Sequence, residues 1–270
     1  MRTLREINHL MKQVQDSILT TNKPVSLPLR VGVDLGTACI AVVVLDHENN
    51  PICCELEWAD VLKDGLVVDF FGAQSIVRRL KENAEKRLGK KLEECAIAMP
   101  PGTTGNERTH RFVVEGAGFE VINVLDEPTA ANAVLDIADG VIVDIGGGTT
   151  GITVFRNGEP VEVADEPTGG THLTLVIAGN QKIPYAEAEA MKLKPKHQKE
   201  LLPVVAPVIE KMATIVQKSV SLQPNDVLYL VGGTCCYLGI EHIFSAVTGL
   251  EVIKPRNPFL ITPTGIAMNG

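Results

Sequence analysis

The sequence lacks the features that mark several large classes of protein. Its net charge is -8 over 270 residues and no run of lysine and arginine exceeds two, so it lacks the basic surface of a nucleic-acid-binding protein. No apolar run is long enough to cross a bilayer, and the first twenty residues are too polar for the core of a signal peptide. We therefore expect a cytoplasmic protein that binds neither nucleic acid nor membrane.

The cysteines and histidines also lack the spacings of familiar sites. The six cysteines include two vicinal pairs and no C-x-x-C, and the histidines show no H-E-x-x-H. Cys235 and Cys236 follow two glycines, but the sequence places no histidine to activate them. We interpret the cysteines as reduced, mostly buried thiols that serve packing.

What the sequence does contain is an internal repeat. Residues 31–45 read VGVDLGTACIAVVVL and residues 141–155 read VIVDIGGGTTGITVF. Each copy has an apolar strand, an aspartate, a glycine turn and a second apolar strand, so that Asp34 and Gly36 correspond to Asp144 and Gly146. Two copies of one unit predict two similar α/β domains.

Similar elements are expected after each copy. Apolar periodicity and turn residues after the first copy predict an apolar strand near 52, helices over 73–88, 108–117 and from 128, and strands over 95–99 and 121–125. After the second copy they predict strands over 160–164, 227–231 and near 252, and helices within 170–220, over 240–247 and from 263.

Such domains would face each other across a cleft, with the two glycine turns opposed. Glycines let backbone N–H groups approach an anion closely. Asp34 and Asp144 cannot bind phosphate themselves, because two anions repel, but they suit a Mg²⁺ ion that keeps some of its waters. Either turn alone could be an ordinary hairpin. The matched pair favours a magnesium–nucleotide site.

Five segments resemble the signature regions of the actin-like ATPase superfamily and follow one another in the superfamily's order. In chain order they are a first phosphate loop (34–38), an interdomain helix (125–135), a second phosphate loop (144–150), an adenosine loop (230–240) and a second interdomain helix (263–268). The resemblance implies a duplicated, ribonuclease H-like α/β fold with two domains. Residues 99–112 and 126–132 further resemble the chaperone-like proteins of bacterial ethanolamine utilisation.

The resemblance also implies roles for single residues. Asp34 and Asp144 would organise the metal through its waters, and Glu127 would orient or activate the attacking water. ATP or ADP would be contacted by residues of the glycine loops, namely Gly36, Thr37, Ala38, Gly146, Gly147, Gly148, Thr149, Thr150, Gly232, Gly233 and Thr234. For Glu127 a simpler interpretation stays open, because a carboxylate just before Pro128 also favours a helix N-terminus.

The domain limits follow from the repeat and the resemblance. We expect an N-terminal helix and proline-containing linker over 1–28, a first domain over 29–138 with 263–270, and a second domain over 139–262. The insertions that roof the cleft in larger relatives are short here, so we expect weak nucleotide binding and slow turnover. Lys192, Lys194 and Lys196 lie near the second short insertion, and the sequence does not show whether one reaches a nucleotide.

The N-terminal helix carries one narrow apolar stripe, formed by Leu4, Ile7, Met11, Val14 and Ile18. The stripe could pack on the chain's own core or lie in a partner's groove. Because the repeat accounts for both domains without it, we expect residues 1–22 to serve recognition rather than stability. The expected partner is an ethanolamine-utilisation enzyme, a microcompartment shell protein or a second copy of the chain.

The function expected from the resemblance is an ATP-binding, chaperone-like or reactivating protein of ethanolamine utilisation, associated with a bacterial microcompartment. A heat-shock type of chaperone cycle is not expected from this chain alone, because no peptide-binding domain follows the cleft. The alternatives are a sugar or acyl kinase, for which the short insertions leave little material, and an actin-like scaffold that does not hydrolyse ATP.

Overall fold

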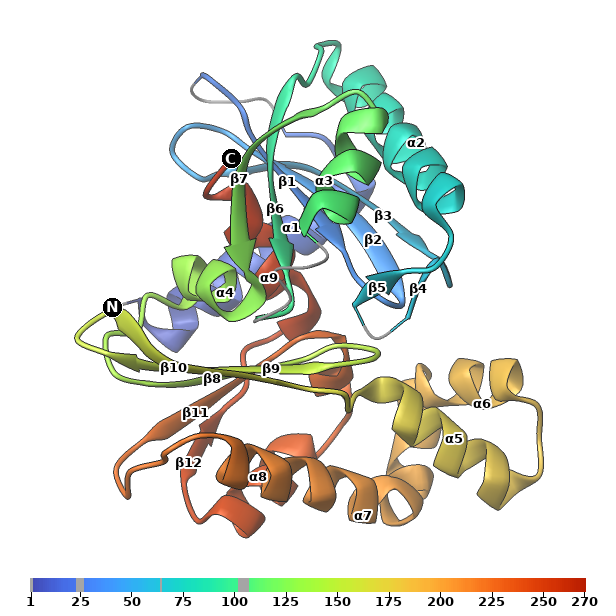
Figure 1. Cartoon of the computed structure of the whole chain (residues 1–270), viewed down its shortest axis with the longest axis vertical. Helices are drawn as coiled ribbons and strands as arrows, with labels where there is room; N and C mark the ends of the chain where they lie inside the picture. Colours follow the sequence, from blue (N-terminus) through green and yellow to red (C-terminus); the bar gives the residue numbers. More distant parts are fainter. Residues whose placement is uncertain (1, 23–26, 64, 102–106) are drawn as a thin grey trace.

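The computed structural model describes residues 2–22, 27–63, 65–101 and 107–270, which form two lobes, one above the other in Figure 1. The sheet of the first lobe has the order β3-β2-β1-β6-β7, and that of the second has the order β10-β9-β8-β11-β12. In the first sheet β1 pairs antiparallel with β2 and parallel with β6. In the second sheet β8 pairs antiparallel with β9 and parallel with β11. The strand orders correspond, so the predicted duplicated α/β fold is confirmed.

The strand bounds agree closely with the sequence pattern. The first sheet contains β1 (Arg30–Leu35), β2 (Cys39–Leu45), β3 (Pro51–Trp58), β6 (Glu94–Met99) and β7 (Glu120–Asp126). The second contains β8 (Gly140–Ile145), β9 (Thr150–Arg156), β10 (Glu159–Glu166), β11 (Val227–Val231) and β12 (Glu251–Ile253).

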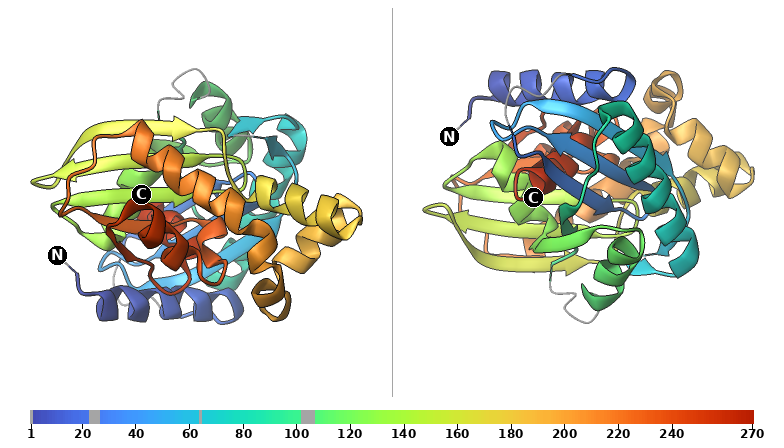
Figure 2. Two further views of the ribbon diagram at one scale, coloured as in Figure 1. Left: turned by 90° about the horizontal axis from the view of Figure 1, so that it is seen from below. Right: turned by 90° about the horizontal axis from the view of Figure 1, so that it is seen from above.

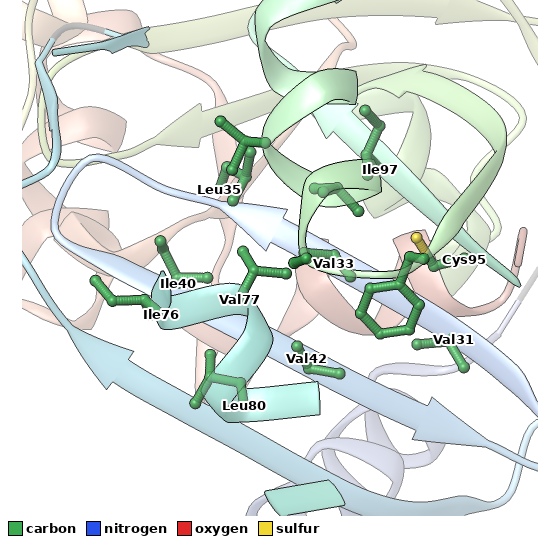
Figure 3. Close-up of a cluster of buried hydrophobic side chains, with 14 of the residues drawn as sticks. Val31, Val33, Leu35, Ile40, Val42, Ile76, Val77, Leu80, Cys95 and Ile97 are labelled. Carbon is green, nitrogen blue, oxygen red and sulfur yellow. The ribbon is translucent and has the colours of Figure 1, made fainter. Parts of the chain in front are cut away.

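Helices cover the outer faces of both sheets. The first lobe has α2 (Phe70–Leu88) and α3 (Glu107–Gly116), and the second has α5 (Gly170–Gln181), α6 (Tyr185–Lys192), α7 (Pro195–Ser219) and α8 (Ile240–Thr248). Figure 3 shows Val33 of β1 and Val42 of β2 close to Val77 of α2 in the core of the first lobe. Alternate residues of each strand face this core because the side-chain period of a strand is two.

The segments that correspond to the short insertions form only small elements. Between β3 and α2 the described residues form only the two-residue strands β4 (Leu62–Lys63) and β5 (Leu66–Val67). In the second lobe, α6 and part of α5 project to one side in Figure 1. The short insertions noted in the sequence therefore correspond to small elements beside the cleft.

Two helices cross between the lobes, α4 (Glu127–Leu135) and α9 (Ile261–Ala267). They pack with almost no space between their backbones. A Cβ atom added to Gly265 would lie 1.8 Å from the carbonyl oxygen of Ala130. On its other side, α9 approaches β1 so closely that a Cβ atom on Gly32 would lie 2.3 Å from the nitrogen of Ala267. Glycine is required at both contacts.

The N-terminal helix, α1 (Leu4–Leu19), packs on the first lobe, and Figure 2 shows it along one flank of the molecule. Ile7, Met11 and Val14 are buried in one cluster with residues of β2 and β3, including Val43 and Cys54. The expectation that this stripe serves recognition rather than stability is therefore wrong. The repeat could not reveal that the face of the first sheet opposite α2 needs a cover of its own.

Polar contacts fix both the end and the side of α1. Arg87 of α2 donates from Nη2 to the carbonyl oxygens of Ser17, at 2.7 Å, and Thr20, at 2.8 Å. A basic side chain satisfies a helix C-terminus in this way. The side chain of Gln15 accepts from Asn257 at 2.6 Å, which ties α1 to the segment leading into α9.

Replacing Met11 with alanine should therefore destabilise the protein by about 2–5 kcal/mol, because Met11 is fully buried and its shortened side chain would leave a cavity. Leu19→Ala is the control, since Leu19 is 89% exposed at the end of the same helix. Urea unfolding of both variants measures the difference. Equally small changes in both would show that the stripe contributes little to stability.

Gly265→Ala should destabilise by roughly 1–3 kcal/mol or more, because the new methyl group must push α9 away from Ala130. Gly179→Ala is the matched control. Gly179 lies in α5 with no atom within 4 Å of an added Cβ, so alanine should stabilise by roughly 0.5–1 kcal/mol. Unfolding midpoints that move in the same direction in both variants would contradict the close crossing.

Candidate functional site

A cleft of about 260 Å³ lies between the lobes, where the β1–β2 turn faces the β8–β9 turn. Side chains and backbone from both turns, from the start of α4 and from the 3-10 helix η2 (Gly233–Cys236) line it. The structure thus brings together segments that are far apart in the sequence.

Nearly all the predicted site residues line this one cleft. They are Asp34, Gly36, Thr37, Ala38, Glu127, Asp144, Gly146, Gly147, Gly148, Thr149, Gly232, Gly233 and Thr234. The exception is Thr150, which is buried in β9 and donates its hydroxyl to the carbonyl oxygen of Thr168 at 2.7 Å. Successive side chains of a strand point to opposite faces, so Thr149 and Thr150 cannot both face the cleft.

The second glycine turn is held from behind by polar contacts. Thr234 Oγ1 donates to the carbonyl oxygen of Gly146 at 2.7 Å, and Gly170 N donates to the same oxygen at 3.0 Å. Gly232 has φ +90°, and a Cβ atom there would lie 2.3 Å from Asp144 Oδ1. The loop over residues 230–240 therefore packs directly against Asp144, and position 232 tolerates only glycine.

Three carboxylates lie close together in the cleft, of which Asp144 is buried and Asp34 and Glu127 are half-buried. Burial, and then the nearby Asp144 carboxylate, raise the pKa of Asp34 to about 7. Burial also raises the pKa of Asp144 to about 6, although a hydrogen bond from the Thr262 hydroxyl opposes this. Burial, then Asp144 and Asp34, raise the pKa of Glu127 well above its usual range. None of the ion pairs among the described residues involves these three carboxylates.

Glu127 has features of both interpretations. The N-cap of α4 is Asp126, whose Oδ1 accepts from the backbone N of Thr129 at 2.8 Å. Glu127 is the acidic residue of the first turn, where a carboxylate favours a helix N-terminus. It also lines the cleft, with its carboxylate near Asp144 and Asp34.

A fourth acid, Asp165 of β10, lies near these three but outside the cleft lining, and the sequence pattern did not single it out. Asp165 stands opposite Gly151 of β9, hydrogen-bonds with Thr149, and has one carboxylate oxygen that is buried without a hydrogen-bond partner. Burial and then Glu166 raise its pKa to about 7, with Asp144 adding to the effect. The predicted strand ended at residue 164, one position too early to include it.

The lysines of the second insertion differ in position. Lys192 lines the cleft, whereas Lys194 and Lys196 are exposed outside it. Lys192 Nζ donates to Thr174 Oγ1 at 2.9 Å and pairs with Glu189 at 2.8 Å. Burial lowers the pKa of Lys192, and the Glu189 carboxylate counteracts this.

The cysteines are mostly buried, as expected. Cys236 differs, because it is exposed and lines the cleft, whereas the other five are buried. Within the segment 99–112, residues 102–106 lie outside the described residues. Within the described part of the chain, no group of three or more His, Cys, Asp or Glu side chains is placed to hold a metal ion.

Two matching sheets, two crossing helices and two opposed Asp-x-Gly turns define an actin-like ATPase fold. A family model described as MreB/Mbl protein matches residues 55–194, and one described as cell division protein FtsA matches residues 141–265. Ethanolamine utilization protein EutJ of Escherichia coli K12 is 43% identical over 90% of this chain and 86% of its own length. The chain therefore belongs to the EutJ family of actin-like ATPases.

Solved structures agree with this assignment. The crystal structure of EutJ from Carboxydothermus hydrogenoformans has a TM-score of 0.94 and 47% identity, covering 100% of both chains. MreB5 of Spiroplasma citri bound to AMPPNP has a TM-score of 0.71 at 17% identity, covering 89% of this chain and 95% of its own, and shows the shared fold alone.

Among the helices that the structure describes, none combines the length and the apolar character needed to span a bilayer.

The buried acids predict a pH dependence of stability in the ligand-free protein. Asp34, Asp144 and Asp165 have pKa values near 7, 6 and 7 in the folded chain, against 3.8 ordinarily. The folded state thus holds protons that the unfolded state has lost, so these three acids contribute most to stability below about pH 4, and their contribution falls as pH rises to about 7. Urea midpoints at pH 5 and pH 8 measure this fall.

Asp165→Asn should make the fall shallower and stabilise the protein more at pH 8 than at pH 5, because it removes one buried charge. Asp60→Asn is the control, since Asp60 is an exposed carboxylate. A pH slope that Asp165→Asn leaves unchanged would show that Asp165 ionises freely in the folded protein.

Proposed function

We propose that this protein binds a magnesium–nucleotide in the cleft, hydrolyses ATP slowly, and acts as a chaperone-like or reactivating protein of ethanolamine utilisation. The observation that carries the nucleotide site is the pair of opposed glycine turns, each with a buried aspartate, that line a single cleft. Backbone N–H groups at such turns suit phosphate, and aspartates beside them suit a cation rather than the phosphate itself.

The residues present fit a magnesium ion that keeps part of its water shell. Asp34 and Asp144 supply hard oxygen ligands, and their raised pKa values indicate a place where negative charge lacks compensation. The described residues provide no group of three or more side chains for direct coordination, which supports contact through water. When bound, Mg²⁺ would neutralise the charge on the phosphates. We assign Asp34 and Asp144 to holding it.

We assign to Glu127 the role of orienting or activating the attacking water. Its carboxylate lies in the cleft beside both aspartates, and it begins a helix that packs against α9. Phosphoryl transfer depends mainly on positioning, so one fixed carboxylate that orients water suffices. Burial disfavours the charged form of Glu127 in the empty cleft, and a bound cation would favour it.

Family membership supports the pathway and the type of partner. The partners proposed are an ethanolamine-utilisation enzyme or a microcompartment shell protein in the cytoplasm. Because the apolar stripe of α1 is buried against the first lobe, a partner would meet the exposed side of residues 2–22 or the surface of the two lobes.

Mg-ATP or Mg-ADP at millimolar concentration should raise the melting temperature, because a ligand that binds only the folded state stabilises it. Asp144→Asn should weaken this binding. Glu127→Gln should leave binding nearly intact and lower the hydrolysis rate by about 10²-fold, as for loss of a positioned general base. The measurements are thermal shift, calorimetry and phosphate release.

Two results would count against this assignment. Equal losses of binding in Asp144→Asn and Glu127→Gln would contradict the division of roles. No thermal shift in the wild-type protein would favour the scaffold that does not hydrolyse ATP.

A further inference from the structure

Two chemically different groups of residues line the cleft. The carboxylates and glycine turns form the polar group, to which phosphate and metal are assigned. Trp58, Phe259, Leu193 and Cys236 also line the cleft and supply aromatic and other weakly polar surface. No role has yet been given to this surface, although a nucleotide has a flat, weakly polar base as well as charged phosphates.

Trp58 lies next to the first glycine turn. It is the last residue of β3 and pairs in register with Cys39, the residue that follows Ala38 of the first glycine turn. Trp58 is the only tryptophan in the chain and is 55% exposed. A large aromatic side chain left this exposed in the lining of a cleft is a surface available to a ligand.

Phe259 stacks on Trp58 from the 3-10 helix η3 (Pro258–Leu260), with ring centroids 5.5 Å apart and planes 15° from parallel. The segment carrying Phe259 is well anchored. Gly232 N donates to the carbonyl oxygen of Pro258 at 3.0 Å, and Arg256 N donates to Asn8 Oδ1 of α1 at 2.7 Å. Phe259 thus supports one face of the Trp58 ring and leaves much of that residue open.

We propose that the Trp58–Phe259 pair is the stacking surface for the base of the bound nucleotide. The inference rests on the proposed nucleotide site and adds a base contact from the first lobe, which is fixed by η3. Stacking on an aromatic face is favourable for every base and does not read its hydrogen-bonding edge. The ligand class is a nucleoside di- or triphosphate, and Trp58 should contribute similarly to adenine and guanine.

The test compares a ligand that has a base with one that lacks it. Affinities of the full chain for Mg-ATP, Mg-GTP and magnesium tripolyphosphate are measured by calorimetry, for wild type and for Trp58→Ala, Trp58→Phe and Phe71→Ala. Trp58→Ala should weaken binding of both nucleotides roughly tenfold and leave tripolyphosphate binding unchanged. Trp58→Phe should retain most of the affinity. Phe71→Ala is the control, because Phe71 is an aromatic residue of α2 that is 77% exposed and outside the cleft lining.

The single tryptophan provides a second readout. Nucleotides should change its fluorescence in the wild-type protein, whereas tripolyphosphate should not. Unchanged tripolyphosphate binding also shows that Trp58→Ala still folds.

Other results would overturn the inference in distinguishable ways. If Mg-ATP binds wild type and Trp58→Ala equally, or if Trp58→Ala loses tripolyphosphate as severely as ATP, the stacking role is wrong and the nucleotide site stands. If the wild-type protein binds none of the three ligands, the proposed function fails and the stacking role fails with it.

Discussion

The rest of the structure depends on the close crossing of α4 and α9. Ala130 and Gly265 bring the two helix backbones together at a distance that no side chain beyond hydrogen permits. The same two helices carry parts of the site, since Glu127 begins α4 and Thr262 of α9 donates to Asp144. The separation of the lobes and the positions of two site residues are thus set by one packing contact. A shift of that contact would move the Glu127 carboxylate relative to both glycine turns.

Acidic side chains gather in and beside the cleft, and none of the ion pairs among the described residues involves the three that line it. Asp34, Glu127 and Asp144 line the cleft, Asp165 lies next to it, and burial raises the pKa of each. Charges of one sign held together lower the stability of an empty fold, whereas a cation bound among them offsets that cost. The arrangement therefore carries a stability cost in the ligand-free protein. Nearby, Lys192 is engaged by Glu189 and Thr174.

The N-terminal helix links regions that the repeat treats as separate. Its apolar stripe covers the first sheet, Arg87 binds its C-terminal carbonyl groups, and Asn8 and Gln15 bind the segment before η3. That segment carries Phe259, so α1 stabilises one wall of the cleft as well as the core. A helix with a narrow stripe can belong to a globular core where a single sheet face is all that it must cover.

The duplicated fold and most of the residues that line the cleft could be predicted from the sequence. Strand alternation, glycine turns and helix caps act over a few residues, so the elements from β1 to α9 and the positions of Asp34, Asp144 and Glu127 could be predicted from local pattern and the superfamily resemblance. The sequence pattern could not show which apolar face α1 covers, that Thr150 turns away or that Lys192 lines the cleft. It also could not show that Asp165 and the Trp58–Phe259 stack adjoin the site. Those facts depend on register between strands and on contacts between residues far apart in the chain, such as Trp58 and Phe259. Side-chain pattern along the chain carries no record of either.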